Sequence, residues 1–185
     1  MKTQKILLVA ILTFALLFGT TSIAQKTVIV GGAPMYPTKN IIQNAVNSKD
    51  HTTLVAAVKA AELVETLSGK GPFTVFAPTN KAFNKLPKGT VANLLKSENK
   101  AMLQSVLTYH VIAGKMDSKT IAALIKAGGG KATLTTVQGG KLIGMMKGKK
   151  LILTDEKGRT SKVIIADVYQ SNGVIHVVNS VVLPK

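Results

Sequence analysis

The spacing of apolar residues divides this chain into a helical first half and a strand-rich second half. Leu54, Val58 and Ala61 recur with a period near 3.6, which predicts a helix over residues 53–67 that a threonine at its start can cap. The same spacing predicts further helices over residues 80–86, 90–96, 98–110 and 118–127, and a short one that begins near residue 41. Two short strands are expected within this half, over residues 73–77 and 111–113.

From residue 131 onward, apolar positions alternate with a period of two and β-branched residues become frequent. This pattern predicts strands over residues 132–137, 141–146, 150–154, 163–169 and 174–183, separated by turns that contain glycine. Helices that precede strands within one domain length favour an α+β fold over a doubly wound sheet. The sequence shows no internal repeat that would suggest a second copy of the domain.

The N-terminus has the pattern of a secretory signal peptide. Lys2 and Lys5 precede an apolar run over residues 6–18, and Ser22 and Ala24 place small residues at the two positions that a signal peptidase requires. The sequence therefore predicts cleavage after Ala24. A membrane anchor is the alternative, but a spanning helix needs roughly 20 apolar residues and this run is shorter.

Cleavage there divides the chain into three parts: a signal peptide over residues 1–24, an N-terminal leader over residues 25–37, and one domain over residues 38–185. The mature protein is expected to have no transmembrane anchor and to be secreted, either into a periplasm or into the extracellular space. The chain has no cysteine, so an exported domain must be stabilised by packing rather than by disulfides.

The chain is strongly basic, with a formal net charge of +16 at pH 7, and Arg159 is its one arginine. Lysine is a hydrated point charge, so a lysine-rich surface favours diffuse attraction to polyanions over a shaped anion pocket. Lys147, Lys149 and Lys150 share one predicted turn and are candidate binding residues. Nucleic acid is an unlikely partner, because single-strand binding uses aromatic platforms and the strand-rich half contains only Tyr169. Solubility alone is the other explanation for the charge.

The sequence offers no constellation that would support catalysis. His51, His110 and His176 are far apart, and no pair of them has the short spacing of metal ligands. The glycine-rich segment over residues 128–131 lacks the spacing of a phosphate-binding loop. We therefore expect a non-enzymatic protein without metal or cofactor. The alternative is an envelope ligand-binding protein or hydrolase whose pocket the sequence does not reveal.

Three segments stand out, and the first covers residues 74–83, with the sequence TVFAPTNKAF. Pro78 has no N–H and ends the strand, and Thr79 can accept from the backbone N–H groups of the helix that follows, with help from Asn80. Phe83 turns inward on that helix. The chemistry of this segment is structural.

The second segment is the dipeptide Tyr109-His110, and the third covers residues 172–184, with the sequence NGVIHVVNSVVLP. The third segment opens with an Asn-Gly pair that tolerates the positive φ of a tight hairpin turn. His176 lies within its strand and is expected to be a buried, hydrogen-bonded histidine, because no partnering set accompanies it. Asn179 lies on the strand face opposite to His176.

Together, in this order and at these distances, the three segments resemble those of a fasciclin domain, and the resemblance covers residues 38–185. It implies a wedge of two β-sheets with several helices packed against it. It also implies extracellular adhesion or matrix association without catalysis. We therefore expect a secreted adhesion module that binds extracellular matrix or a cell-surface glycan or other polyanion. A single exported copy without cysteine favours a bacterial source.

The resemblance also assigns roles to particular residues. Thr79, Asn80, Phe83, His110, His176 and Asn179 match structural positions of the family motifs. The family commonly has aspartate at the position of Asn80 and often an acidic residue at that of Asn179. In animal members the Tyr-His region is implicated in integrin binding, which makes Tyr109 and His110 candidate adhesion residues. The Asp-Ile dipeptide of those members is absent here.

Overall fold

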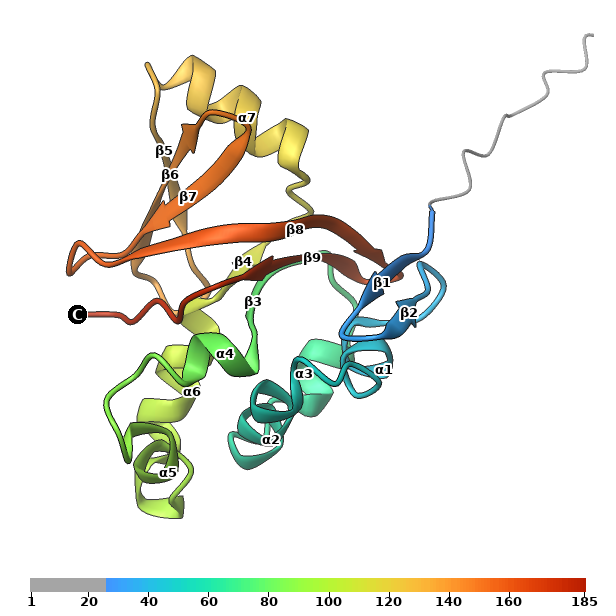
Figure 1. The fold of residues 1–185 in the computed structure, drawn as a ribbon, viewed down its shortest axis with the longest axis vertical. Helices are drawn as coiled ribbons and strands as arrows, with labels where there is room; N and C mark the ends of the chain where they lie inside the picture. Colours follow the sequence, from blue (N-terminus) through green and yellow to red (C-terminus); the bar gives the residue numbers. More distant parts are fainter. Residues whose placement is uncertain (1–25) are drawn as a thin grey trace, which may run out of the picture.

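The computed structural model describes residues 26–185 and has the α+β fold that the sequence predicts (Figure 1). Its helices are α1 (Ile41–Ala45), α2 (Thr52–Ala60), α3 (Val64–Ser68), α4 (Asn80–Phe83), α5 (Thr90–Leu94), a 3-10 helix (Ser97–Asn99), α6 (Lys100–Tyr109) and α7 (Ser118–Ala127). Its strands are β1 (Val28–Val30), β2 (Ala33–Met35), β3 (Phe73–Pro78), β4 (Val111–Ala113), β5 (Ala132–Thr135), β6 (Lys141–Lys147), β7 (Lys150–Thr154), β8 (Thr160–Gln170) and β9 (Gly173–Val178).

Seven strands pair in the order β4-β3-β9-β8-β7-β6-β5, and β3 with β9 is the parallel pair. The long strand β8 pairs with β7 through residues 160–162 and with β9 through residues 163–170, where two register shifts interrupt the ladder. Such bulges bend a strand and increase its twist. The sheet therefore turns at β8 into two halves, which corresponds to the two-sheet wedge expected from the sequence.

Strands β3 and β9 are buried on both faces, because their side chains alternate between two apolar cores. One core takes Val75 from β3 and Val177 from β9, together with apolar residues of α1 to α6. The other takes Phe76 and Val178 from the same two strands and lies inside the bend of the sheet under α7. Figure 1 shows the two groups of helices on opposite sides of these strands.

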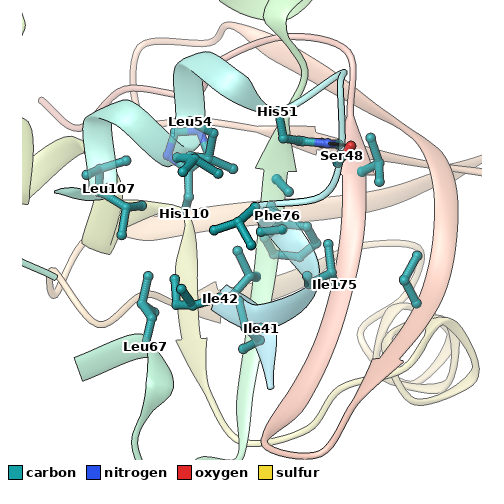
Figure 2. A pocket seen from close by; sticks show the side chains of 18 of the residues that line it. Ile41, Ile42, Ser48, His51, Leu54, Leu67, Phe76, Leu107, His110 and Ile175 are labelled. Atoms are coloured by element: carbon teal, nitrogen blue, oxygen red, sulfur yellow. Dashed lines mark hydrogen bonds between the residues drawn. The ribbon is translucent and has the colours of Figure 1, made fainter. Parts of the chain in front are cut away.

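The core under α1 to α6 is not completely filled. A cavity of about 80 Å³ remains between α1, α2, α3 and strands β3 and β9, and apolar side chains form most of its wall. In Figure 2, Ser48 and His51 lie side by side at one side of this lining, and Leu67 and Leu107 lie at the other.

The single helix predicted over residues 53–67 is wrong in one respect, because the structure breaks it into α2 and α3. Glu62 has a φ of 58°, and the N–H of Leu63 donates to the carbonyl of Val58 at 3.0 Å. This hydrogen bond is typical of a helix C-terminus at which one residue adopts the left-handed conformation. Glycine usually occupies that position, and Glu62 occupies it here. The break turns Val64 and Leu67 toward the cavity.

Residues 28–35 form a β-hairpin that the sequence pattern does not predict. Val30 and Met35 are buried in the core under the helices, and the N–H of Lys49 donates to the carbonyl of Gly31 at 3.1 Å. Most of the segment expected to be a leader therefore packs against the domain. The signal peptide expected over residues 1–24 lies outside the described residues. Between residues 26 and 185, no helix combines the length and apolarity needed to cross a membrane.

The cap of α7 is Asp117, the residue before the first residue of the predicted helix. Its carboxylate accepts from the N–H of Thr120 at 2.8 Å. The N–H of Ser118 instead donates to the carboxylate of Asp167 at 2.7 Å. A carboxylate is a better acceptor at a helix N-terminus than a hydroxyl, because it also complements the helix dipole.

Candidate functional site

The first motif joins β3 to two helices. Thr79 caps α4, where its hydroxyl accepts from the N–H of Ala82 at 3.2 Å. Asn80 does not assist this cap. Its side-chain oxygen accepts from the N–H of Thr53 at 3.0 Å, and its amide donates to the carbonyl of Lys49 at 2.9 Å. Asn80 thereby supplies the cap of α2 from a distant segment, whereas the prediction that Thr52 or Thr53 caps this helix is wrong.

The second residue of the third motif, Gly173, must be glycine for a reason other than the turn. Neither Asn172 nor Gly173 has a positive φ, contrary to the expectation from the sequence. A Cβ at Gly173 would instead lie 2.1 Å from the carbonyl oxygen of Phe73, so only glycine allows β9 to approach β3 here. The Asn172 amide donates to the carbonyl of Leu67 at 2.8 Å, and its oxygen accepts from the N–H of Ile41 at 3.0 Å.

Tyr109 and His110 are both buried, with 0% and 3% of their surfaces exposed. The Tyr109 hydroxyl donates to the carbonyl of Lys141 at 2.7 Å and accepts from the N–H of Glu156 at 3.3 Å. The Nδ1 atom of His110 lies 2.8 Å from the carbonyl of Val106, and its Nε2 atom accepts from the N–H of Val182 at 3.2 Å. Tyr109 and His110 are candidate adhesion residues, but the folded domain does not expose their side chains to a partner.

These contacts fix one tautomer of His110, with the proton on Nδ1 and the lone pair on Nε2. Desolvation by burial lowers the pKa of His110 to about 4, against smaller opposing effects of the Val106 carbonyl and of Asp155. The ring is therefore neutral at pH 7.

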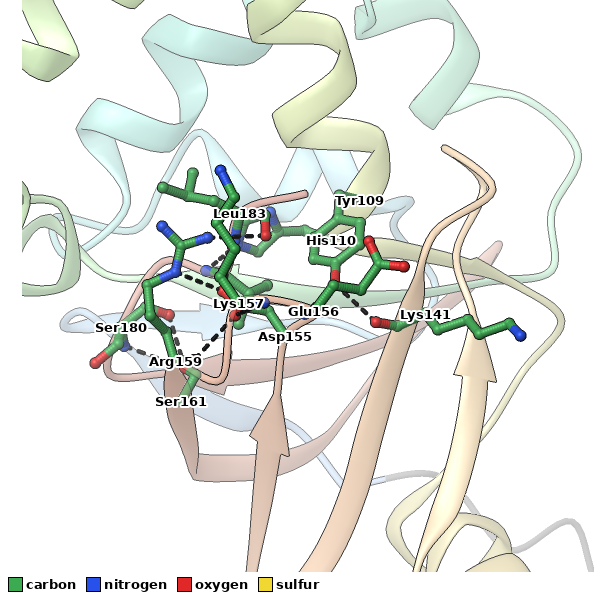
Figure 3. A network of polar contacts seen from close by, with 11 residues as sticks. Tyr109, His110, Lys141, Asp155, Glu156, Lys157, Arg159, Ser161, Ser180 and Leu183 are labelled. Carbon is green, nitrogen blue, oxygen red and sulfur yellow. Dashed lines mark hydrogen bonds and ion pairs between the residues drawn. The ribbon is translucent and has the colours of Figure 1, made fainter. Parts of the chain in front are cut away.

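The C-terminal segment is held by side chains rather than by a strand, although the sequence predicts that the strand continues to residue 183. Strand β9 ends at Val178. Beyond it, the N–H of Leu183 donates to the carboxylate of Asp155 at 3.1 Å, and the Arg159 guanidinium donates to the Leu183 carbonyl at 2.9 Å. Figure 3 shows these residues gathered beside Tyr109 and His110.

Asp155 organises this network. Its side chain is fully buried and forms an ion pair with Arg159 at 2.8 Å. It also accepts from the backbone N–H groups of Lys157 at 3.0 Å and Arg159 at 2.9 Å. Buried carboxylates are stable only when their lone pairs are satisfied in this way. The guanidinium of the one arginine in the chain is therefore bonded to groups of the fold.

His176 is likewise satisfied by the fold. Its Nε2 atom lies 2.9 Å from the carbonyl of Met116, its Nδ1 atom accepts from the N–H of Asp167 at 3.3 Å, and its ring stacks on Phe76 with centroids 5.6 Å apart. Burial lowers the pKa of His176. Asn179 follows β9, and its side-chain oxygen accepts from the N–H of Lys162 at 2.8 Å. Both side chains connect neighbouring segments.

The candidate lysines lie elsewhere, at the turn between β6 and β7. Lys147 and Lys150 are exposed and directly opposite each other in the strand register, and Lys149 lies in the turn between them. A surface hollow of about 430 Å³ lies beside this turn. Its wall contains Lys149, Lys150 and Lys162, the exposed apolar side chains of Met146 and Ile164, and parts of Ser118, Leu151, Val163, Ala166 and His176.

No acidic side chain forms an ion pair with a lysine of this hollow within the described part of the chain. Asp155 is paired with Arg159, and Asp167 is bonded to Ser118. None of the ion pairs found among residues 26–185 involves Lys147, Lys149 or Lys150. Lys162 and the two apolar residues were not singled out as site residues from the sequence. Lys162 and Ile164 lie on β8, which reaches the hollow only when it pairs with β7.

No group of three or more His, Cys, Asp or Glu side chains suited to a metal ion exists among residues 26–185. The functional residues expected from the sequence thus fall into two sets. The motif residues connect backbone segments inside the fold, and the turn lysines face solvent beside the hollow.

The motifs, the helices on a bent sheet and the parallel β3–β9 pair define the class of protein. The chain belongs to the fasciclin family, since the Fasciclin domain matches it over residues 49–184.

Among its relatives, Protein sll1483 of Synechocystis sp. is 42% identical over 181 residues, which cover 95% of this chain and 93% of that protein. The cell surface glycolipoprotein MPB83 of Mycobacterium bovis is 33% identical over 145 residues, which cover 76% of this chain and 58% of that protein. A solved FAS1 domain pair from the insect cell adhesion molecule Fasciclin I shares the fold, with a TM-score of 0.71 and 16% identity over 78% of this chain and 51% of that one.

Proposed function

We propose that this protein is an exported, non-enzymatic adhesion module that binds an acidic polysaccharide of the cell surface or matrix through the hollow beside the β6–β7 turn. The observation that carries this proposal is a set of three lysines around one hollow, Lys149, Lys150 and Lys162, none of which forms an ion pair within the described chain. The relatives support its class, because their names include a cell surface protein and a cell adhesion molecule.

The arrangement of the turn supports an anionic ligand. Like charges that lie directly opposite each other on paired strands destabilise a sheet, and Lys147 and Lys150 are such a pair. Lys149 adds a third positive charge in the same turn. An anion bound between these lysines would remove the repulsion between them. The free energy that this repulsion costs in the free domain would therefore favour binding.

The apolar side chains in the hollow favour a polysaccharide over a simple inorganic polyanion. Sugar rings have apolar faces of C–H groups, and acidic sugars add carboxylates or sulfates. Met146 is 40% exposed and Ile164 is 48% exposed, and both lie in the same wall as the lysines. A sugar ring can cover these side chains while its acidic group approaches a lysine.

The test compares binding of the mature protein to an acidic polysaccharide, such as heparin, with binding to a neutral glycan over a range of salt concentrations. Binding to the acidic polymer is expected to weaken steeply with salt, because each charge contact releases counterions. The variant in which Lys147, Lys149 and Lys150 are all replaced by glutamine is expected to bind more weakly and with a shallower salt dependence.

A charge-matched control replaces Lys70, Lys81 and Lys88 by glutamine. These lysines are exposed and far from the β6–β7 turn in the sequence, and they make no side-chain hydrogen bond or ion pair within the described chain. The control is expected to retain most of the affinity. Equal losses in the two triple variants would mean that net charge alone attracts the polymer. Tight, salt-insensitive binding to the neutral glycan would place the adhesive surface elsewhere.

A further inference from the structure

We propose that Asn172 is a site of spontaneous covalent modification, namely deamidation, that the native fold protects and that unfolding exposes. Conversion of its side-chain amide to a carboxylate removes contacts on which the fold depends, so the modified chain refolds with lower stability. The reaction needs no partner other than water. The proposal does not depend on the lysine hollow, because Asn172 lies in the turn between β8 and β9 and does not line that hollow.

The chemistry of deamidation makes Asn172 the most reactive asparagine of the unfolded chain. The backbone nitrogen of the following residue attacks the side-chain carbon Cγ, a C–N bond forms, and ammonia leaves with the proton of the attacking nitrogen. Water then opens the resulting five-membered succinimide ring at either carbonyl group, which yields aspartate or isoaspartate. A side chain on the following residue hinders the attack. Of the nine asparagines in the chain, only Asn172 precedes a glycine, which has no Cβ.

In the native fold, two helices hold the side chain of Asn172. Its amide donates to the carbonyl of Leu67 at 2.8 Å and to that of Gly69 at 3.0 Å, both at the end of α3. Its oxygen accepts from the N–H of Ile41, at the start of α1, at 3.0 Å. Closure of the ring moves Cγ onto the nitrogen of Gly173 and expels the amide nitrogen. These hydrogen bonds therefore oppose the reaction as long as α1 and α3 remain in place.

The peptide group between Asn172 and Gly173 is fixed as well. The Asn172 carbonyl accepts from the N–H of Phe73 at 3.0 Å, and Gly173 pairs with Phe73 on one side and with Gln170 on the other. A Cβ at Gly71 would lie 2.0 Å from the Asn172 carbonyl oxygen, so the chain before β3 packs directly against this group. Its carbonyl carbon and its nitrogen both become members of the succinimide ring, so the ring forms only if the peptide group can move.

Exclusion of water does not account for the protection. Asn172 is partly exposed, and with Gly173 it lines a surface hollow of about 550 Å³ between the turn and the segment that follows α3. Water therefore reaches the residue in the native state, and its contacts with the fold are what prevent ring closure. The native protein is expected to react through opened forms alone. Its rate of deamidation then follows the population of those forms.

Both products lack contacts that the native state uses. In aspartate, a carboxylate oxygen replaces the amide nitrogen and faces the carbonyl oxygens of Leu67 and Gly69 without a hydrogen to donate. Isoaspartate adds an atom to the backbone immediately before β9 begins. Strand β9 pairs with β3 and β8 and supplies Val177 to one core and Val178 to the other, so a displaced start of this strand disturbs both cores.

The experiment incubates the mature wild-type protein at mildly alkaline pH, once folded and once unfolded in guanidinium chloride. Peptide mass spectrometry then measures aspartate and isoaspartate at residue 172. Conversion is expected to be at least about a hundredfold faster in the unfolded protein, because the folded protein reacts only through its small open population. Equal rates in the two states would overturn the proposal.

Asn47 is the internal control in the same samples. It is exposed and precedes a serine, and its side-chain amide makes one hydrogen bond, to the carbonyl of Gln43 at 2.8 Å. Its rate of conversion is expected to differ much less between the folded and the unfolded protein. A ratio at Asn47 as large as that at Asn172 would mean that the contacts of Asn172 give no particular protection, and it would overturn the proposal.

A second measurement tests the effect of the modification on the fold. Partly converted protein is transferred to the guanidinium concentration at which the unmodified chain begins to unfold, and size-exclusion chromatography separates folded from unfolded chains. Aspartate and isoaspartate at residue 172 are expected to collect in the unfolded fraction, whereas conversion at Asn47 is expected to be equal in both fractions. The Asn172→Asp variant is likewise expected to unfold at a lower guanidinium concentration than Asn47→Asp. Equal shares of modified residue 172 in the two fractions would overturn the proposal, whereas loss of lysine-dependent adhesion would leave it untouched.

Discussion

Protonation of His110 is expected to destabilise the fold in mildly acidic solution. Its Nε2 atom accepts from the N–H of Val182, so a proton on Nε2 would replace this hydrogen bond by repulsion between two N–H groups. The charge would also be buried, because His110 is only 3% exposed. The unfolded chain has no such restriction and binds the proton with a pKa near 6.5.

The magnitude follows from the difference between the two pKa values. The pKa is about 4 in the folded state, so the unfolded state binds more protons between pH 6.5 and pH 4. Stability therefore falls as the pH is lowered through this window. The expected loss from His110 alone is about 2 kcal/mol at pH 5 and about 3 kcal/mol at pH 4, relative to pH 8. Burial also lowers the pKa values of His51 and His176, so their contributions have the same sign.

The assay is urea unfolding of the wild type and of His110→Gln at pH 8 and pH 5. The glutamine side chain can still accept from Val182 but does not titrate, so the variant is less stable at pH 8 and loses about 2 kcal/mol less on acidification. The difference between the two proteins isolates His110, because all other groups titrate in both. Parallel pH profiles for wild type and variant would refute the reasoning.

Three further predictions concern other parts of the chain. Asp155→Ala is expected to lower the free energy of unfolding by about 3 kcal/mol in urea, because several N–H groups and Arg159 lose their acceptor; a loss below 1 kcal/mol would contradict the role of this network. Asn80→Ala is expected to cost about 1–2 kcal/mol through loss of the α2 cap, whereas Asn80→Asp retains the acceptor and most of the stability. Mass spectrometry of the exported protein is expected to show cleavage after Ala24, and a mature form that begins at Met1 would refute the signal peptide.

The order of helices and strands could be predicted because local patterns determine it. The alternation of Val75 and Phe76 and the period of the α2 residues depend only on which face is buried. The β1–β2 hairpin was missed because its strands have only three residues each, too few for a period to be seen. The break at Glu62 was missed because the local sequence has neither glycine nor proline to mark it.

The candidate site was less predictable, because tertiary contacts create it. The turn lysines could be found from the sequence, since glycine and charge mark an exposed turn. Lys162 reaches the same hollow only through the pairing of β7 with β8. The cap of α2 by Asn80 joins residues 27 positions apart, and no local pattern encodes it.

The pairing of β3 with β9 joins two strands that lie far apart along the chain. Phe73 pairs with Gly173, so the strand that separates the two cores is synthesised about 100 residues after its partner. Contacts this distant in sequence form late, after a large loop-closure entropy has been overcome. A nascent chain that lacks β9 cannot complete either core, because Val177 belongs to one core and Val178 to the other. The two cores are therefore expected to become complete together, in one late step of folding.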